Sequence, residues 1–293
     1  MDRAISLWFE SIRHGFLDYF FLFITEFGDE LVFLILSSIL YWLVNKEIGY
    51  RFMMIFLGTI AVNDAIKFLV ARPRPFQAGV VSVVGEGSYG YSMPSGHAQG
   101  SMTMALTLHD DFGKTNQWVT PVVFTMAILV SISRIYLGQH YFSDVIVGML
   151  VAFAVFYAIK LIAPKIKLTT QKFIYMISPV LIGLLFLIDE KNYFVAVAAM
   201  LALTIGYDLE KKYINYTAKG TVWVQVAKYA IGLMVALLLK EGLKMVLPYT
   251  TDIDADMTQF DLFLDFVRYF ILCLWLSLGS FFVFSKLFKQ KQA

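Results

Sequence analysis

The sequence predicts an all-α fold, a polytopic bundle of membrane-spanning helices. Of its 293 residues, 59% are hydrophobic and 16% are charged, whereas about 25% of a typical soluble domain is charged. The mean hydropathy is +0.68. The apolar residues also fall into stretches long enough to cross a bilayer, which takes about 20 residues. Together these observations indicate a multi-pass membrane protein.

The remaining bulk properties exclude several classes of function. A net charge of +2 is too small to indicate a nucleic-acid partner. Cys273 is the one cysteine, so an internal disulfide is excluded and thiol chemistry is not indicated. We expect no cofactor, and the sequence does not identify a protein partner.

Residues 1–24 are expected to form the first helix. Apolar residues recur there at helical spacing, but Asp2, Arg3 and Glu10 interrupt them. The pattern indicates an amphipathic helix in or near the membrane interface. A poor first spanning helix is the alternative. A secretory signal peptide is not indicated, because it needs an uninterrupted apolar core.

The rest of the chain divides into apolar stretches of spanning length. We expect nine spans, at 29–45, 50–70, 97–112, 117–137, 143–163, 173–189, 192–208, 222–247 and 262–286. Two of the connections are long: residues 72–96 are rich in Pro, Gly and Ser, and residues 248–261 are acidic.

The basic residues predict the orientation of these spans. If the spans alternate in direction, one set of loops contains most of the basic residues, namely Lys46, Arg51, Lys114, Lys160, Lys165, Lys167, Lys172, Lys211, Lys212, Lys219, Lys286, Lys289 and Lys291. The positive-inside rule places this set in the cytoplasm. The opposite loops then face the periplasm, the cell exterior or an organelle lumen. We expect a bacterial plasma membrane, or the endoplasmic reticulum membrane in a eukaryote.

Three polar segments stand out from the apolar chain, at residues 67–75, 94–97 and 133–144. A charged side chain at the centre of a spanning helix costs roughly 2.5–3.5 kcal/mol. Groups that costly usually face one another, so the three segments predict one active site near the outer ends of their helices.

The first segment supplies cations at the end of a helix. Lys67 and Arg74 are seven residues apart, about two helical turns, and the prolines that follow end the helix. Asp64 lies one turn before Lys67 and is expected to hold its side chain. Arg72 lies outside this spacing and is expected to anchor the chain at the membrane surface.

The second segment, Pro94-Ser95-Gly96-His97, is typical of a helix N-terminus. Ser95 can cap the helix, and Gly96 allows the backbone to come close to a ligand. Free N–H groups at such an end attract anions. Alone, this segment would indicate only an ordinary helix cap.

In the third segment His140 and Asp144 are four residues apart, a spacing that stacks two side chains on one face of a helix. Asp144 can then accept the Nδ1 proton of His140 and leave Nε2 free as a nucleophile. Arg134 lies one to two turns earlier. A salt-linked helix hairpin is the alternative interpretation.

These residue types together suit a phosphoryl group. Arg74 and Arg134 can bind oxygens in bidentate fashion, and Lys67 supplies a point charge. Fixed cations stabilise the charge that develops on the equatorial oxygens in the transition state. His97 and His140 can divide the covalent and proton-transfer roles. No Asp, Glu and His residues have the spacing of a divalent-metal site, so we expect turnover without a metal ion.

The three segments resemble, in order, the three signature motifs of the type 2 phosphatidic acid phosphatase superfamily. The matching patterns are Lys67-x6-Arg74-Pro75, Pro94-Ser95-Gly96-His97 and Ser133-Arg134-x5-His140-x3-Asp144. The resemblance implies that His140 becomes a phosphohistidine, that Asp144 orients it, and that His97 protonates the leaving oxygen and later activates water. It also implies a set of phosphate-binding residues, Lys67, Arg74, Ser95, Gly96 and Arg134.

The same resemblance implies the domain organisation. Residues 1–163 would form the six-helix core that this superfamily shares with chloroperoxidases, with residues 1–24 as its first helix. Residues 164–293 would add about four C-terminal transmembrane helices. Such a chain is also similar to sphingosine phosphate phosphatases and to the glucose-6-phosphatase branch.

The leading hypothesis is a phosphatase for a lipid phosphate or diphosphate of the phosphatidate, phosphatidylglycerophosphate, polyprenyl diphosphate or sphingoid phosphate type. Its partners would be that lipid and the bilayer. The alternatives are a phosphatase for a soluble sugar phosphate, an anion transporter and a catalytically inactive lipid-binding relative.

Overall fold

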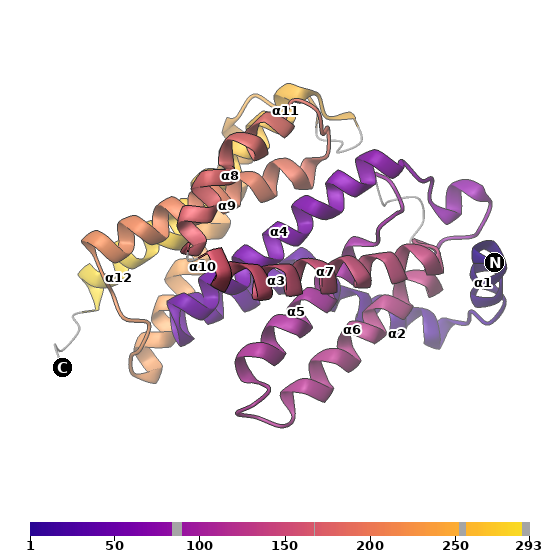
Figure 1. Ribbon diagram of the computed structural model, residues 1–293, viewed down its shortest axis with the longest axis horizontal. Helices are drawn as coiled ribbons and strands as arrows, with labels where there is room; N and C mark the ends of the chain where they lie inside the picture. Colours follow the sequence, from indigo (N-terminus) through magenta and orange to yellow (C-terminus); the bar gives the residue numbers. More distant parts are fainter. Residues whose placement is uncertain (84–89, 167, 252–255, 289–293) are drawn as a thin grey trace. The chain divides into compact units, whose positions relative to one another are not determined.

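The computed structural model describes residues 1–83, 90–166, 168–251 and 256–288, and these form helices without any strand. The α-helices are α1 (Asp2–Ser11), α2 (Gly15–Thr25), α3 (Glu30–Ile39), α4 (Lys46–Val70), α5 (Gly96–Phe112), α6 (Val119–Tyr136), α7 (Phe142–Ile166), α8 (Thr170–Leu184), α9 (Lys191–Tyr213), α10 (Val222–Val246), α11 (Gln259–Leu274) and α12 (Ser280–Leu287) (Figure 1). The all-α prediction is confirmed.

The helices group into two compact units. Unit 1 comprises Met1–Leu34 and Gly58–Lys165, and unit 2 comprises Ile35–Leu57 and Ile166–Ala293. Helices α3 and α4 therefore contribute to both units. The predicted functional division after residue 163 stays a prediction.

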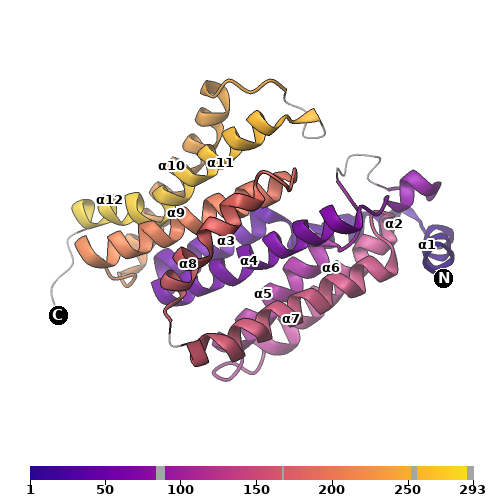
Figure 2. The ribbon, with the colours of Figure 1, turned by 45° about the horizontal axis from the view of Figure 1, so that its top comes forward.

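In unit 1, α6 packs against both α5 and α2. Figures 1 and 2 show α5 and α6 side by side, joined by a short loop at one end. Ile5 and Phe9 of α1 pack against a small apolar cluster formed by Ala98, Ile135 and Val145. Helix α1 is thus fixed to the beginnings of α5 and α7 and to the end of α6.

The single helix expected over residues 1–24 is in fact two helices, α1 and α2, with a break at Ile12–His14. Arg13 explains the break. Its Nε donates to the carbonyl oxygen of Tyr136 at 2.9 Å, and its Nη1 donates to the carbonyl oxygen of Val81. A helix that continued through residue 13 would lose these contacts to distant segments.

Six helical segments are long and apolar enough to cross a membrane, in the part of the chain that the structure describes. They are Lys46–Ala78, Val119–Tyr136, Phe142–Ile162, Lys191–Tyr213, Val222–Val246 and Gln259–Leu287. A seventh candidate is the pair Gly15–Gly28 and Glu30–Val44, which is bent by 47°. These findings support a multi-pass membrane protein.

The prediction of nine separate spans is too high by this measure. Two predicted spans form helices of fewer than 18 residues and are not counted. Span 97–112 corresponds to α5, with 17 residues, and span 173–189 corresponds to α8, with 15 residues. Buried polar residues lower the hydropathy of α5, and Pro179 lies inside α8. A third predicted span, 29–45, meets the criterion only as part of the bent pair.

In unit 2, α11 packs along α9. A short π-helical segment at Trp275–Gly279 contacts α9, α10, α11 and α12, and a second one, at Leu40–Val44, contacts α10. A π turn leaves backbone groups without their α-helical partners. Trp42 Nε1 donates to the carbonyl oxygen of Leu276 at 2.9 Å, and the Tyr41 hydroxyl donates to that of Ser277 at 3.3 Å. The two irregular segments thus stabilise each other.

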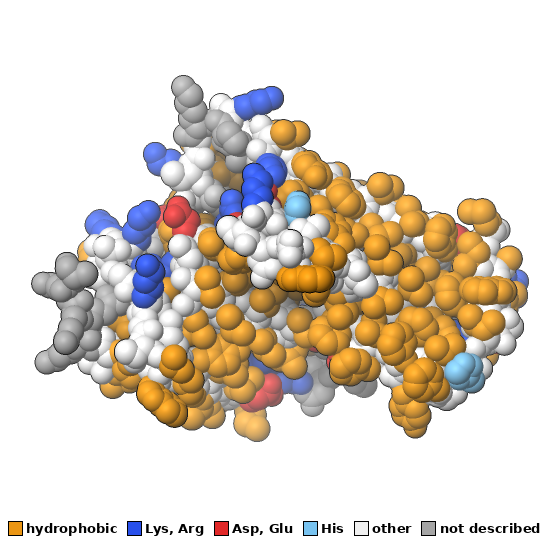
Figure 3. Space-filling view, turned by 90° about the horizontal axis from the view of Figure 1, so that it is seen from below, with side chains coloured by type: hydrophobic (Ala, Val, Ile, Leu, Met, Phe, Trp, Pro, Cys, Tyr) orange, Lys and Arg blue, Asp and Glu red, His pale blue; other side chains and the backbone are white. Residues whose placement is uncertain are grey.

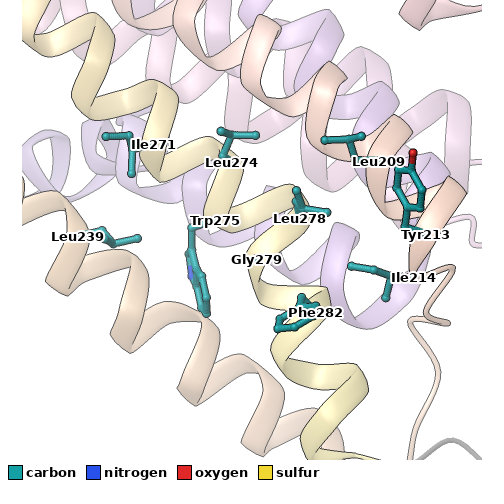
Figure 4. A pocket seen from close by; sticks show the side chains of 10 residues that line it. All are labelled: Leu209, Tyr213, Ile214, Leu239, Ile271, Leu274, Trp275, Leu278, Gly279 and Phe282. Atoms are coloured by element: carbon teal, nitrogen blue, oxygen red, sulfur yellow. The ribbon is translucent and has the colours of Figure 1, made fainter.

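Unit 2 also contains a hollow of about 580 Å³ beside the Trp275–Gly279 segment (Figure 4). Apolar side chains from α9, α10, α11 and α12 line it, among them Leu209, Leu239 and Phe282. None of the predicted site residues lies in this hollow.

Apolar side chains cover broad areas of the surface in the view of Figure 3. Along α7, Leu150 and Leu161 are exposed, and along α10, Val226 and Leu238 are exposed. Exposed apolar faces on helices of spanning length are typical of surfaces that contact lipid.

Candidate active site

The predicted site residues of all three segments lie at one end of unit 1. Helix α4 ends at Val70 just before Arg74, and α5 begins at Gly96. Helix α6 ends at Tyr136, and α7 begins at Phe142, with His140 in the turn between them. The helix termini therefore bring together residues that are far apart in the sequence.

Lys67 lies in the last turn of α4 and faces the start of α5. Its Nζ is 3.6 Å from Oδ1 of Asp64, as the spacing of the two residues predicted. A Cβ atom at Gly96 would lie 3.9 Å from the same Nζ. The ammonium group is therefore beside the free N–H groups at the N-terminus of α5.

Two further hydrogen bonds join α4 to α5 next to this lysine. Nδ2 of Asn63 donates to Oε1 of Gln99 at 2.7 Å, and Nε2 of Gln99 donates to the carbonyl oxygen of Thr59 at 2.5 Å. All three residues are buried. This network fixes the position of Lys67 relative to Gly96.

The second segment forms the N-terminus of α5. Oγ of Ser95 accepts a hydrogen bond from the N–H of Ala98 at 3.5 Å, so Ser95 is the predicted cap. The N–H of Ser95 donates to the carbonyl oxygen of Asp144 at 3.0 Å. Helix α7 crosses closely here, because a Cβ atom at Gly148 would lie only 2.7 Å from the carbonyl oxygen of Ser95. A glycine at residue 148 is what lets α7 approach.

His97 projects from the first turn of α5 and remains partly exposed. A Cβ atom at Gly28 would lie 3.1 Å from Cδ2 of its ring. The charges that act on this ring are those of Arg134, Lys67 and Arg74. His97 therefore faces the same group of cations as the third segment.

The turn that carries His140 is fixed by the main chain of Arg134. The carbonyl oxygen of Arg134 accepts the N–H groups of Gln139 at 3.1 Å and His140 at 3.2 Å. Gly138 has a φ of +75°, a conformation that favours glycine. The turn reverses the chain between α6 and α7 and presents His140.

Arg134 itself is buried and positively charged. Its Nη1 donates to Oγ1 of Thr25 at 2.8 Å. Its Nε is also buried and has no hydrogen-bond partner among the described residues. A buried donor without a partner costs about 1–3 kcal/mol, so this nitrogen is ready to donate to an anion.

Arg74 contacts the His140 ring directly. Its Nη1 donates to Nε2 of His140 at 3.3 Å and to the carbonyl oxygen of Gln139 at 3.3 Å. Its Nε donates to the carbonyl oxygen of Gly90 at 3.0 Å. An anion bound by this guanidinium would therefore lie next to Nε2.

The other ring nitrogen of His140 is fixed by Ser92. Nδ1 donates to the carbonyl oxygen of Ser92 at 2.7 Å. These contacts place the proton on Nδ1 and leave Nε2 unprotonated, with its lone pair directed at Nη1 of Arg74. The structure thus gives His140 the tautomer expected of a nucleophile.

The surroundings of His140 also favour the neutral ring. His140 lies in a buried connection between two spans. Burial first, and then the positive charges of Arg74, Arg134 and Lys67, hold the pKa of His140 well below its usual range. His97 acts on it as well. Burial and these neighbouring cations therefore favour the neutral form of the imidazole.

The predicted hydrogen bond from His140 to Asp144 is not formed. Nδ1 of His140 and Oδ2 of Asp144 are 3.9 Å apart, which is too long for a hydrogen bond. Instead Oδ2 accepts from Oγ of Ser92 at 2.5 Å and from the N–H of Tyr141 at 2.8 Å. Asp144 reaches the imidazole through Ser92.

The prediction that Arg72 anchors the chain at the membrane surface is wrong. Its Nη1 donates to Oδ1 of Asp144 at 2.7 Å, and its guanidinium lies 4.1 Å from the centroid of the Tyr141 ring. In an extended Arg-Pro-Arg-Pro segment, residues two apart point the same way. That rule, applied to Arg72 and Arg74, would have placed both at the third segment.

Comparisons with known proteins identify the family of this chain. Residues 48–168 match the PAP2 superfamily, and residues 194–292 match the transmembrane extension of PAP2 superfamily phosphatases. The chain belongs to the PAP2 superfamily. Every predicted site residue lies within the PAP2 match, and most of unit 2 after α8 lies within the extension.

Individual PAP2 relatives are similar at modest identity. Sphingosine-1-phosphate phosphatase 1 of Rattus norvegicus is 29% identical over 138 residues, which are 45% of this chain and 32% of that protein. Undecaprenyl-diphosphatase of Sulfolobus acidocaldarius is 30% identical over 134 residues, 44% of this chain and 62% of that protein. The matched part of this chain thus spans about a third of the rat protein.

Among solved structures, a crystal structure of a transmembrane PAP2-type phosphatidylglycerolphosphate phosphatase from Bacillus subtilis is similar to this chain. It is 27% identical, the match covers 56% of this chain and 85% of that one, and the TM-score is 0.48.

Proposed function

We propose that this protein is a phosphatase that removes phosphate from a membrane lipid phosphate or diphosphate, with His140 as the nucleophile. The observation that carries the proposal is the pair of contacts on the His140 ring. Nδ1 donates to Ser92, and Nε2 faces the Arg74 guanidinium at 3.3 Å. A nucleophilic lone pair next to a fixed cation is what phosphoryl transfer to histidine requires.

In the first step, the lone pair of Nε2 attacks phosphorus while the bond from phosphorus to the leaving oxygen breaks. The bound phosphate anion offsets the charges of Arg134, Lys67 and Arg74, so His97 carries a proton in the complex and gives it to that oxygen. The alcohol or phosphate product leaves neutralised at the breaking bond. Arg74, Arg134 and Lys67 bind the equatorial oxygens, on which charge is spread in the transition state. The N–H groups at Ser95 and Gly96 add donors.

In the second step, His97 takes a proton from water, and the water oxygen attacks phosphorus. The bond from phosphorus to Nε2 breaks, inorganic phosphate leaves, and His140 returns to its neutral form. Asp144, through Ser92, favours the positive charge that the imidazole carries while it is phosphorylated. Neither step requires a metal ion or a cofactor.

A lipid substrate is supported by the surroundings of the site. The site lies at the ends of helices of spanning length, and α7 exposes apolar side chains along its surface. A lipid can keep its acyl chains in the bilayer while its phosphate reaches the helix ends. The relatives described above are named as phosphatases of a sphingoid phosphate, a polyprenyl diphosphate and a phosphatidylglycerophosphate.

The extracytoplasmic side is supported by the charges at the other end of unit 1. Helices α5 and α7 both begin at the site and run away from it. At their far ends Nζ of Lys160 donates to Oδ1 of Asp110 at 2.5 Å. Lys114 follows the end of α5, and Lys165 lies in the last turn of α7. The positive-inside rule places these ends in the cytoplasm and the site on the opposite side.

A substrate panel tests the proposal. Purified protein in detergent is given phosphatidate, phosphatidylglycerophosphate, a polyprenyl diphosphate, a sphingoid phosphate and glucose 6-phosphate, and released phosphate is measured. We expect release from at least one lipid and loss of that release in His140→Ala. Preference for glucose 6-phosphate would favour a sugar phosphatase, and turnover by His140→Ala would remove His140 as the nucleophile.

A further inference from the structure

Arg72 occupies a position that the proposed mechanism does not use. Among the described residues, no hydrogen bond joins its side chain to the cations around the His140 ring or to the start of α5. Its side chain is instead placed between two carboxylates: Nη1 donates to Oδ1 of Asp144 at 2.7 Å, and Nη2 donates to Oδ2 of Asp2 at 2.9 Å. Nη1 also donates to Oγ of Ser143 at 2.6 Å.

These contacts connect Arg72 to His140 by two routes. Through its side chain, Arg72 holds Asp144, which accepts the Ser92 hydroxyl at 2.5 Å. Through its main chain, the carbonyl oxygen of Arg72 accepts the N–H of Ser92 at 2.8 Å. The carbonyl oxygen of Ser92 in turn accepts a hydrogen bond from Nδ1 of His140 at 2.7 Å. Arg72 therefore fixes both ends of the residue that orients the imidazole.

Asp144 depends on this arginine for its charge balance. Its side chain is fully buried. Among the described residues, Arg72 is the permanently charged cation with which Asp144 forms an ion pair. A buried carboxylate that loses its cation is strongly disfavoured. Without Arg72, Asp144 would take up a proton or turn away, and its contact with Ser92 would change in either case.

The same arginine joins helix α1 to the site. Asp2, in the first turn of α1, accepts from Arg72 and also from Oγ of Ser143 at 2.5 Å. The N–H of Ser143 donates to Oδ1 of Asp2 at 3.3 Å. Asp2 thus holds the second nitrogen of the guanidinium and keeps the first one directed at Asp144.

We propose that Arg72 is a positioning residue that holds the His140 imidazole in its reactive orientation through Asp144 and Ser92, and that Asp2 of helix α1 completes this support. The inference rests on the proposed function, because it assigns Arg72 to the reaction of that same histidine. It predicts that Arg72 affects the chemical step without binding the phosphate.

Steady-state kinetics on the preferred lipid test this role with Arg72→Gln, Arg72→Lys and the control Arg3→Gln. Arg3 lies beside Asp2 on α1, but its side chain is exposed, so the control removes the same charge from the same region. We expect Arg72→Gln to lower kcat by about 10–100-fold, as loss of a partner that orients a functional histidine does elsewhere, with KM changed by less than about threefold. Arg72→Lys should recover part of the loss.

A double-mutant cycle tests whether Arg72 acts through Asp144. If it does, Arg72→Gln should lower kcat in the wild-type background but not further in an Asp144→Asn background. Fully additive losses would overturn the proposed route, and so would a rise in KM with unchanged kcat. Asp2→Asn should lower kcat in the same sense but by less, because it removes only the second contact.

A substrate-free measurement separates this inference from the proposed function. Diethyl pyrocarbonate modifies neutral imidazoles, and mass spectrometry gives the rate at each histidine. We expect Arg72→Gln to speed the modification of His140, whose ring is no longer held, and to leave the exposed His109 unchanged. An unchanged rate at His140 would overturn the inference even if turnover is normal, whereas absence of turnover in the wild type would overturn only the proposed function. Should Arg72→Gln not fold, Asp2→Asn, which removes the other contact of the guanidinium, must speed the modification of His140 in the same sense, or the inference fails.

Discussion

Replacement of Arg74 by lysine probes the cation that lies closest to the proposed nucleophile. The guanidinium is buried and makes three contacts at once, to Nε2 of His140, to the carbonyl oxygen of Gln139 and to that of Gly90. Lysine keeps the positive charge, but its single ammonium group cannot make all three contacts or bind two phosphate oxygens side by side.

The structure separates the effect of this change on stability from its effect on turnover. Two carbonyl oxygens, of Gly90 and Gln139, lose a charged donor, which costs about 1–3 kcal/mol in the free energy of unfolding. The transition state loses one fixed donor to an equatorial oxygen, a loss that typically lowers kcat by about 10²–10³-fold. We therefore expect Arg74→Lys to remain folded at the assay temperature and to be nearly inactive.

The assay is phosphate release from the preferred lipid in detergent, with thermal unfolding of the same samples measured in parallel. Arg3→Lys is the matched control, because Arg3 is exposed and its replacement should change neither quantity. A kcat for Arg74→Lys within about threefold of wild type would refute the reasoning, since the guanidinium geometry would then contribute almost nothing to the transition state.

Three further predictions follow from the same site. A chelator should leave phosphate release unchanged, and a loss of activity that magnesium restores would contradict turnover without a metal ion. Because burial and neighbouring cations lower the pKa of His140, its neutral form persists in acid, and the acid limb of kcat/KM assigned to it should lie below about pH 6.5; a limb above that value would contradict the proposed environment. Gly148→Ala places a Cβ atom 2.7 Å from the carbonyl oxygen of Ser95, so we expect about 1–3 kcal/mol of destabilisation; Gly183→Ala, which meets nothing within 4 Å, is the control and should be neutral.

The residues of the site could be predicted from the sequence because each charged side chain is costly in a membrane helix. Lys67 and Arg74 stand out from an apolar background, and so do His97 and His140. The spacing of Asp64 and Lys67 on one helix also predicted their contact, in which Nζ of Lys67 is 3.6 Å from Oδ1 of Asp64. The cap at Ser95 also follows from local sequence alone.

The partners of His140 could not be predicted in this way, because they depend on where α7 begins. The spacing of His140 and Asp144 stacks them only if both residues are helical, but α7 begins at Phe142. His140 therefore lies in the preceding turn, and its Nδ1 meets the carbonyl oxygen of Ser92. Ser92 lies in the long connection after α4, where no periodic pattern indicates what a residue contacts.

The nine predicted spans exceed the six helices that are long and apolar enough to cross a membrane in the described part of the chain. Helix α5 carries a row of buried polar residues, including Gln99 and Thr103, that bond to α4 or to their own helix. Counting apolar residues along the sequence cannot distinguish a helix whose polar side chains are hydrogen-bonded inside the bundle from a helix that faces lipid. Two short helices also replaced the expected first one, because the side chain of Arg13 bonds to segments far away in the sequence.

The central claim is that a single imidazole, that of His140, carries the phosphoryl group between the lipid and water. Rapid mixing with radiolabelled substrate, an alkaline quench that preserves phosphohistidine, and mass spectrometry locate any phosphorylated residue. The account predicts label on His140 alone, and more of it in His97→Ala, where water attacks slowly. Label on another residue, or turnover during which His140 never becomes phosphorylated, would contradict it.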